Sequence, residues 1–337
     1  MKRIVVTGVV LLLVLFLLPV LLVDGPEDMQ EAAKPGVLPA LPSPVQTEQP
    51  AQPGEDELTT LRVALEDGTV AEMTMADYLW SVVAAEMPAA FEPEALKAQA
   101  VTARTYALWK MAAGDADHPD ADVCTDITCC QAYITPEQAA GNWGSAAAVY
   151  KQKITSAVNS TNGQVITYEG EPIQAVFFSS AAGKTVDAVE VWGSAVSYLC
   201  SVDSPEGEEV PNWRSQAAFS PEEAKALILA QYPGADLSAG PENWFGAPVL
   251  AEGGSVSQIT VGGVTLTGAQ VRSLFSLRSA TFTVAYQGGK FVFDVTGYGH
   301  GVGMSQYGAN AMAKNGSDFR EILTWYYTGT EVDVLWA

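Results

Sequence analysis

An apolar run from Ile4 to Val23, directly after Lys2 and Arg3, restricts the fold of this chain more than any other feature. Twenty such residues in a helix span the hydrocarbon core of a bilayer, and the basic flank keeps the start of the chain in the cytoplasm. A cleaved signal peptide is the alternative, but the sequence VDGP that follows has no small-x-small cleavage pattern. We therefore expect residues 1–23 to be an uncleaved transmembrane anchor of a single-pass cell-membrane protein whose C-terminal domain is extracytoplasmic.

Residues 24–57 have the composition of a linker. They hold seven prolines, eight acidic residues and one base, so they cannot bury enough apolar surface to offset chain entropy. We expect the folded domain to occupy residues 58–337. The formal net charge of −22 argues against a nucleic-acid partner, which requires basic patches.

The hydrophobic pattern of residues 58–337 alternates between hairpins and helices. Four hairpins are expected around turns that contain Gly: Leu61–Leu65 with Val70–Met73, Val165–Tyr168 with Ile173–Phe178, Ile259–Val261 with Val264–Leu266, and Thr281–Tyr286 with Lys290–Val295. Helical patterns cover 75–86, 93–113, 136–150, 221–232, 268–276, 304–314 and 318–327. This predicts an α+β fold, with mixed hairpins and helices around a substrate cleft. The segment 205–254, rich in Pro, Gly and Glu, is expected to be a surface excursion.

Glu86 is predicted to lie in the last turn of a helix that ends before Pro88, since a residue that precedes proline is pushed out of the α region. A carboxylate at this end faces the negative end of the helix dipole, and its Ala and Met neighbours solvate it poorly. Both effects raise its pKa, as a general acid near neutral pH requires.

Two other stretches are ambiguous on their own. Lys97 and Arg104 are seven residues apart and fall on nearly one helical face, which is typical of a solvated basic stripe as well as of a site. In the turn 297–304, glycine alternates with other residues, so that a ligand or another backbone can come close. His300 in this turn is either a structural histidine or a cleft residue.

Four potential metal ligands lie within thirteen residues: His118, Cys124, Cys129 and Cys130. Sulfur and imidazole ligands in a short loop suit tetrahedral zinc, and four protein ligands would leave no open position for water, so that such a zinc would be structural. Disulfides or free thiols are the alternatives for an extracytoplasmic chain. Cys200 is left over and is expected to be a buried small hydrophobe.

Four segments resemble the stage II sporulation protein D family. Members of that family are membrane-anchored lytic transglycosylases that act during engulfment in endospore formers. The four segments are AAEMPAAFEPEALKAQAVTARTYAL (84–108), FFSSAAGKTVDAVEVWG (177–193), YLCSVDSP (198–205) and GYGHGVGMSQYGANAMAKNG (297–316). The resemblance implies that Glu86 is the catalytic acid and that some members hold zinc in the cysteine loop. The residues expected to contact the glycan, from the resemblance and their place in these motifs, are Lys97, Arg104, Ser179, Lys184, His300, Gln306 and Tyr307.

The leading hypothesis is a lytic transglycosylase that cleaves the peptidoglycan bond between N-acetylmuramic acid and N-acetylglucosamine to 1,6-anhydromuramic ends. The resemblance implies a preference for glycan strands stripped of stem peptides, and an engulfment amidase and a membrane scaffold protein as partners. A non-catalytic wall-binding enhancer of an amidase is the alternative, because related proteins described as amidase enhancers share these motifs. A zinc hydrolase is disfavoured because the expected metal site is full.

Overall fold

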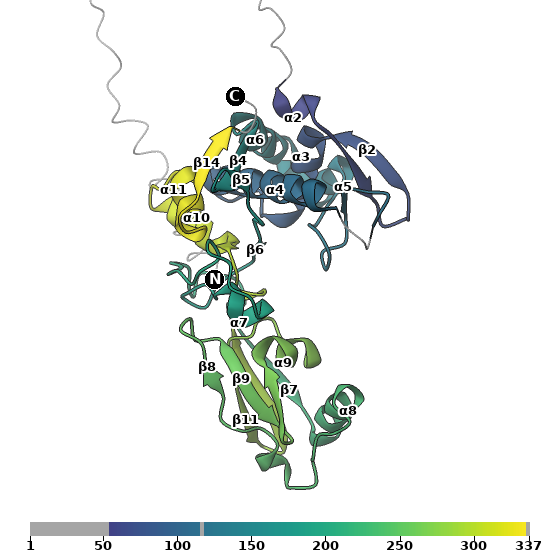
Figure 1. Ribbon diagram of the computed structural model, residues 1–337, viewed down its shortest axis with the longest axis vertical. Helices are drawn as coiled ribbons and strands as arrows, with labels where there is room; N and C mark the ends of the chain where they lie inside the picture. The colour runs from purple at the N-terminus through teal and green to yellow at the C-terminus, as the bar shows by residue number, and fades with distance from the viewer. Residues whose placement is uncertain (1–53, 115–117, 335–337) are drawn as a thin grey trace, which may run out of the picture. The chain divides into compact units, whose positions relative to one another are not determined.

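The computed structural model of the chain describes residues 54–114 and 118–334. The expected anchor, residues 1–23, and most of the expected linker lie outside these ranges. Within the described ranges, none of the helices is both long and apolar enough to cross a membrane. Helices and small sheets are mixed along the described chain, so the predicted α+β class is confirmed (Figure 1).

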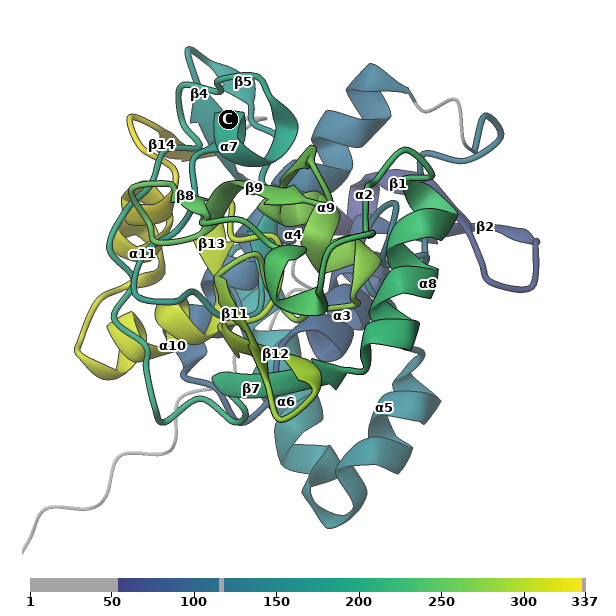
Figure 2. The ribbon, with the colours of Figure 1, turned by 90° about the horizontal axis from the view of Figure 1, so that it is seen from below.

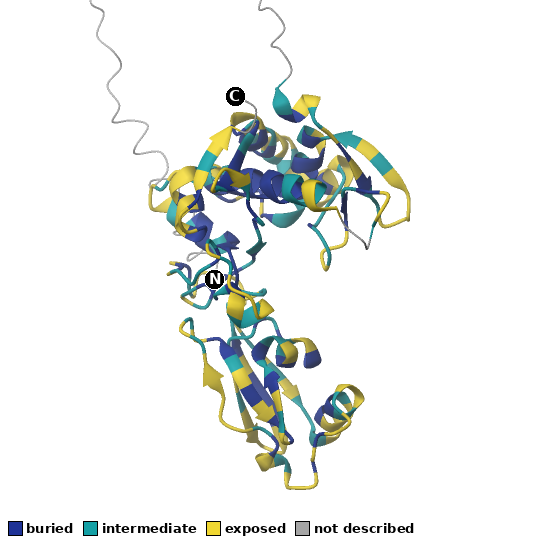
Figure 3. Cartoon of the chain, in the orientation of Figure 1, coloured by how far each residue is buried: buried dark blue, intermediate teal, exposed yellow. Residues whose placement is uncertain are grey.

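A first hydrophobic core is built around one long helix, α4 (Pro93–Ala113). Pro93 suits its first turn, where no backbone donor is needed, and Gly114 ends it with φ +68°. Alanines such as Ala98, Ala100 and Ala103 are fully buried, so neighbouring helices can pack closely on several sides. Figure 3 shows α4 as predominantly buried. The other helices of this part are α2 (Glu55–Leu58), α3 (Met75–Glu86), α5 (Pro136–Trp143), α6 (Ala147–Ser160), α7 (Ala188–Trp192), α10 (Gln306–Lys314) and α11 (Phe319–Tyr326).

Three small sheets border this core. The first has the order β2-β1-β3, the second β14-β4-β5, and the third joins β13 to β6 in parallel. Their strands are β1 (Thr60–Ala64), β2 (Val70–Thr74), β3 (Val123–Cys124), β4 (Gln164–Tyr168), β5 (Glu171–Pro172), β6 (Phe177–Phe178), β13 (Met304–Ser305) and β14 (Glu331–Val334). The β13–β6 pair places two segments far apart in the sequence side by side.

A second hydrophobic core takes its buried residues from two further sheets, β11-β12-β7 and β10-β9-β8, and from the helices beside them. Its centre is aromatic, with Phe275 and Phe293 at a centroid separation of 4.8 Å. Figures 1 and 2 both show α8 beside the first of these sheets. The elements are β7 (Arg214–Phe219), α8 (Pro221–Gln231), β8 (Val249–Leu250), β9 (Val256–Val261), β10 (Val264–Thr267), α9 (Gly268–Leu274), β11 (Phe282–Gln287) and β12 (Lys290–Thr296).

The first, third and fourth expected hairpins are confirmed by antiparallel pairing. The second is wrong beyond Pro172, because β4 pairs with only two residues of β5 and with β14, while Phe177 and Phe178 pair with β13. The helix expected over 136–150 is interrupted at Gly144, whose φ of +53° is not helical, and continues as α6 to Ser160.

Two domain-level expectations are corrected. The segment 205–254 is not a surface excursion, since it contributes β7, α8 and β8, and buries Ile228 and Trp244 in the second core. The linker does not extend to residue 57, because Glu55–Leu58 form α2 and Asp56 is buried. An acidic, proline-rich composition cannot reveal that one of its acids has a buried cationic partner.

Candidate functional site

Glu86 is the last residue of α3, where the sequence predicts it. Met87 follows with extended backbone, because Pro88 prevents the helix from continuing. The half-buried carboxylate accepts hydrogen bonds from the Ala132 backbone N–H at 2.7 Å and from Gln306 Nε2 at 3.4 Å. Burial raises the pKa of Glu86, and the bonds from Ala132 and Gln306 oppose that rise only in part.

Glu86 lines a cavity of about 520 Å³, a size typical of small-ligand sites. Its walls come from the end of α3, Tyr106 of α4, the loop 127–132, the segment 176–179, the turn 298–300, Arg272 of α9 and Gln306 of α10. Among the described residues that line it, Glu86 carries the one carboxylate and Arg272 is the one Lys or Arg.

The glycine-rich turn meets the chain's own backbone in the segment that precedes and includes β6. A Cβ at Gly303 would lie 2.1 Å from the Val176 carbonyl oxygen, and one at Gly299 would lie 2.7 Å from Phe178 Cβ. Both glycines have positive φ, which L side chains rarely adopt. The close approach that the pattern predicts is thus an internal contact, and it forms one wall of the cavity.

Ser179, His300 and Gln306 all line the cavity. His300 Nδ1 accepts from the Val302 N–H at 3.1 Å, so its proton is on Nε2, which donates to the Phe177 carbonyl at 3.0 Å. Burial and nearby Arg272 lower the pKa of His300 to about 4, so it is neutral at pH 7. With both nitrogens bonded to backbone, His300 shapes the cavity wall rather than offering a polar contact.

Tyr307 does not line the cavity. Its ring packs edge-on against Phe91 with a centroid separation of 5.0 Å, and its backbone N–H donates to the Ser179 carbonyl at 3.0 Å. Gln306 and Tyr307 are consecutive in α10, so their side chains point about 100° apart around the helix. Only the first of the two can therefore face Glu86.

The expectation that Arg104 lines the cleft is wrong. Its side chain is fully buried, and it forms a two-point ion pair with Asp56, with Arg104 Nε 2.7 Å from Oδ1 and Nη2 2.5 Å from Oδ2. Nη1 donates to the Gln164 carbonyl at 3.0 Å. The face of α4 that carries Arg104 is covered by α2 and β4, which helical periodicity alone does not show.

The two predicted lysines also lie away from the Glu86 cavity. Lys97 Nζ pairs with Glu94 at 2.7 Å and lines a separate hollow beside α6. Lys184 Nζ pairs with Asp203 at 3.4 Å and Glu252 at 3.6 Å. Each of the three expected cations therefore has a carboxylate partner outside the cavity.

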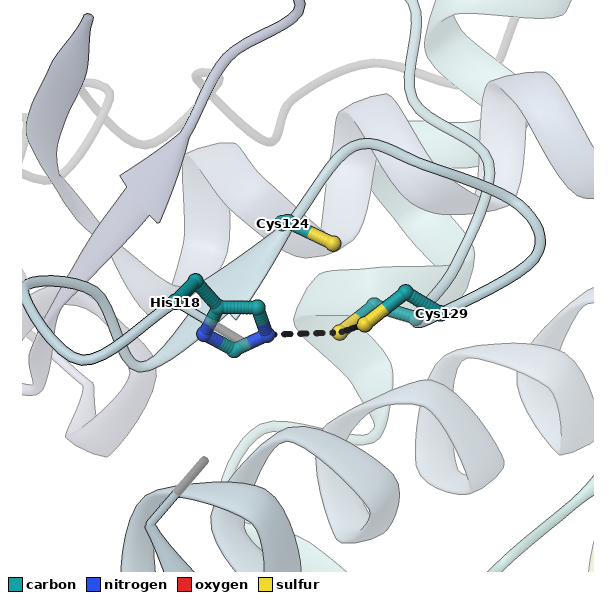
Figure 4. A group of neighbouring side chains, drawn as sticks. His118, Cys124 and Cys129 are labelled. Carbon is teal, nitrogen blue, oxygen red and sulfur yellow. Dashed lines mark hydrogen bonds between the residues drawn. The ribbon is translucent and has the colours of Figure 1, made fainter. Parts of the chain in front are cut away.

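The four predicted metal ligands do come together, and Figure 4 labels three of them, His118, Cys124 and Cys129. The donor atoms of His118, Cys124, Cys129 and Cys130 all lie within 4.8 Å of one another, and all four cysteines of the chain are free thiols. His118 Nε2 is 3.5 Å from Cys130 Sγ, and the sulfurs of Cys129 and Cys130 are 3.8 Å apart. A tetrahedral zinc with bonds of about 2.0 Å to nitrogen and 2.3 Å to sulfur separates its ligand atoms by about 3.5–3.8 Å.

Cys200 is only partly buried, so the expectation of a buried small hydrophobe is wrong. Its thiol donates to the Ser197 carbonyl at 3.3 Å. It takes no part in the cysteine cluster.

Several groups at the cavity were not predicted from the sequence, among them the Ala132 backbone N–H, Arg272 and Tyr298. Tyr298 lies within the glycine-rich motif between two glycines, which is a usable signal. The other two lie in stretches with no distinctive pattern, and only the fold brings them to Glu86.

The chain is similar in sequence to known sporulation proteins. A family model described as Stage II sporulation protein matches residues 66–168. The chain is 34% identical over 340 residues to Stage II sporulation protein D of Bacillus subtilis (strain 168), covering 98% of this chain and 96% of the relative. Identity to the protein of the same name from Bacillus amyloliquefaciens is 38% over 265 residues, covering 78% and 75%. The Amidase enhancer of Bacillus subtilis (strain 168) is 28% identical over 302 residues, which cover 75% of this chain and 40% of that protein.

These matches place the chain among sporulation proteins, and it belongs to the stage II sporulation protein D family.

Proposed function

We propose that the protein is a lytic transglycosylase that cleaves peptidoglycan strands between N-acetylmuramic acid and N-acetylglucosamine. The observation that carries this proposal is the single carboxylate, Glu86, among the described residues that line the cavity. Hydrolytic glycosidases generally use two carboxylates, one for the leaving oxygen and one for water or the sugar. One carboxylate suffices when the nucleophile belongs to the substrate itself.

In the proposed reaction Glu86 acts first as an acid and then as a base. It donates its proton to the glycosidic oxygen, the bond from muramic C1 to that oxygen breaks, and the glucosamine leaves with a 4-hydroxyl group. The muramic C6 hydroxyl oxygen bonds to C1, and its proton passes to Glu86. No water is consumed, and the product is a 1,6-anhydromuramic end. The raised pKa of Glu86 favours the protonated form that the first step needs.

The proposal extends to the substrate and the partner. Glycan strands without stem peptides would be the preferred substrate, so the enzyme would work with an amidase that removes those peptides. The name of one relative, Amidase enhancer, supports a connection with amidases. It also supports the second candidate function, a non-catalytic enhancer of amidase activity.

We further propose a structural zinc held by His118, Cys124, Cys129 and Cys130. Their donor atoms fit a tetrahedral set after small movements. His118 Nδ1 lies 3.2 Å from the Ala121 carbonyl, which leaves Nε2 directed at the sulfurs with its lone pair. When bound, the metal would fix the loop conformation, and it would supply no chemistry at Glu86.

The test is to incubate the purified protein with intact strands and with amidase-treated strands, and to identify the fragments by mass spectrometry. We expect anhydromuramic ends, formed faster from the treated strands. Glu86→Gln keeps the shape but removes the proton, so it should lower cleavage by at least about a hundredfold while the thermal unfolding temperature is kept.

Hydrated reducing ends would contradict the one-carboxylate mechanism. No cleavage by the wild-type protein, together with faster peptide release when an amidase is present, would establish the enhancer instead.

A further inference from the structure

Arg272 is a cation at the cavity that the preceding proposal does not use. The chain has 17 Lys and Arg against 39 Asp and Glu, so acidic side chains greatly outnumber the basic ones. Arg272 lines the same cavity as Glu86, and no carboxylate of the described residues lies within ion-pairing distance of it. Lys97, Arg104 and Lys184 are each paired.

A backbone carbonyl fixes one nitrogen, Nε, of the Arg272 guanidinium. The residue lies in the last turn of α9 and is half-buried. Its Nε donates to the Arg278 carbonyl at 3.2 Å. No described protein group takes up the two terminal nitrogens of the guanidinium, which can form two parallel bonds to a carboxylate.

A second arginine strengthens the positive potential at this wall. The Arg278 guanidinium lies over the Tyr298 ring, 3.9 Å from its centroid, and its buried Nε has no hydrogen-bond partner. Tyr298 is 43% exposed and lines the cavity. A half-buried cation without a counter-charge is costly, so this wall is suited to a ligand that brings a negative charge.

We propose that Arg272 binds the lactyl carboxylate of N-acetylmuramic acid and so selects strands without stem peptides. This inference rests on the proposed glycan substrate. In an intact strand the lactyl group is joined to the peptide through a neutral amide, and the carboxylate becomes free only after an amidase has acted. The lactyl group can therefore form a bidentate bond to arginine only in the stripped strand.

The stem peptide also carries carboxylates, so the experiment has to distinguish the two sources. Three ligands serve: stripped strands, stripped strands whose lactyl carboxylates have been converted to methylamides, and intact strands. Equilibrium binding is measured with the full chain carrying Glu86→Gln, which prevents cleavage. We expect stripped strands to bind about tenfold more tightly than either other ligand, as for a charge-assisted bond.

Arg272→Gln in the same background should remove this difference by weakening only the binding of stripped strands. Arg214→Gln is the matched control, because Arg214 is exposed, pairs with Glu208 at 2.9 Å and does not line the cavity. It removes the same charge and should keep the tenfold preference. Arg272→Lys keeps the positive charge, so it should retain part of the preference that Arg272→Gln loses. Binding by this variant would also show that a substitution at position 272 leaves the protein folded.

The proposal is overturned if Arg272→Gln keeps the preference, or if it weakens all three ligands equally. Intact strands that bind as tightly as stripped strands would assign the site to stem-peptide carboxylates and overturn it as well. Because the readout is binding, an absence of anhydro products from the wild-type protein would reject the proposed activity without touching this result.

Discussion

At the scale of single residues, the protonation of Glu86 depends on groups with opposite effects. Burial disfavours the charged form, whereas the Ala132 N–H and the Gln306 amide favour it. Burial is the largest of these influences, so the pKa lies above its ordinary value of 4.5. A larger fraction of Glu86 is therefore protonated near neutral pH than for an exposed glutamate.

Gln306→Met should move the high-pH limb of the rate profile to higher pH. Cleavage begins with protonated Glu86, so the rate falls as pH rises through the pKa of Glu86. Methionine keeps the length of the side chain but removes a donor that favours the carboxylate, so this pKa should rise further. The measurement is the initial rate of glycan cleavage against pH.

Tyr307→Phe provides the control for this profile. Tyr307 is the next residue of α10, but it packs on Phe91 away from the cavity. Tyr307→Phe should leave the high-pH limb of the rate profile at its wild-type position. A limb that stays in place or moves to lower pH in Gln306→Met would show that Gln306 does not set the pKa of Glu86.

At the scale of elements, the loop from Cys124 to Ala132 contributes both to the Glu86 cavity and to the cysteine cluster. Cys129 and Ile127 line both the Glu86 cavity and a neighbouring hollow bordered by His118 and Cys124. A few residues later, the Ala132 N–H reaches Glu86. A metal at the cysteine cluster would thus stabilise the same loop that positions the carboxylate.

The purified protein should hold about one zinc per chain. Removal of the zinc with a chelator should lower the thermal unfolding temperature by several degrees, and activity should fall in consequence because the loop loses its anchor. Elemental analysis and thermal unfolding measure the two effects.

Two cysteine variants make this test specific. Cys124→Ser should lose the metal, whereas Cys200→Ser should keep it, because Cys200 lies outside the cluster. Protein that contains no zinc, or equal zinc in both variants, would reject the site.

At the scale of the whole molecule, one buried ion pair joins the start of the described chain to its centre. Asp56 of α2 accepts two bonds from Arg104 of α4, and the same guanidinium reaches β4. Asp56 Oδ1 also accepts the Gly163 N–H at 3.4 Å. Three elements separated in the sequence therefore meet at this pair.

Asp56→Ala should destabilise the protein by about 3–5 kcal/mol, because it leaves a buried guanidinium without a counter-charge. Glu57→Ala, the exposed neighbour, should change stability by less than about 0.5 kcal/mol. Denaturant unfolding of both variants gives the comparison.

The double variant Asp56→Leu with Arg104→Met should recover much of the loss, since an apolar pair of similar volume removes the buried charge. A loss below about 1 kcal/mol for Asp56→Ala would mean that water or another group compensates Arg104. Retained glycan cleavage in the double variant would agree with the position of Arg104 outside the cavity.

Features that depend on residues close together in the chain could be predicted from the sequence. Proline ends α3 at Glu86 and starts α4, glycine-containing turns form three of the four expected hairpins, and the cysteine cluster forms because its ligands lie within thirteen residues. Each of these depends on neighbours in the chain. The tertiary structure decided which side chains face the cavity, because periodicity identifies a face of a helix but not what covers it. Arg104 therefore lies inside the core, and Arg272, 186 residues after Glu86 in the chain, lies at the same cavity as Glu86.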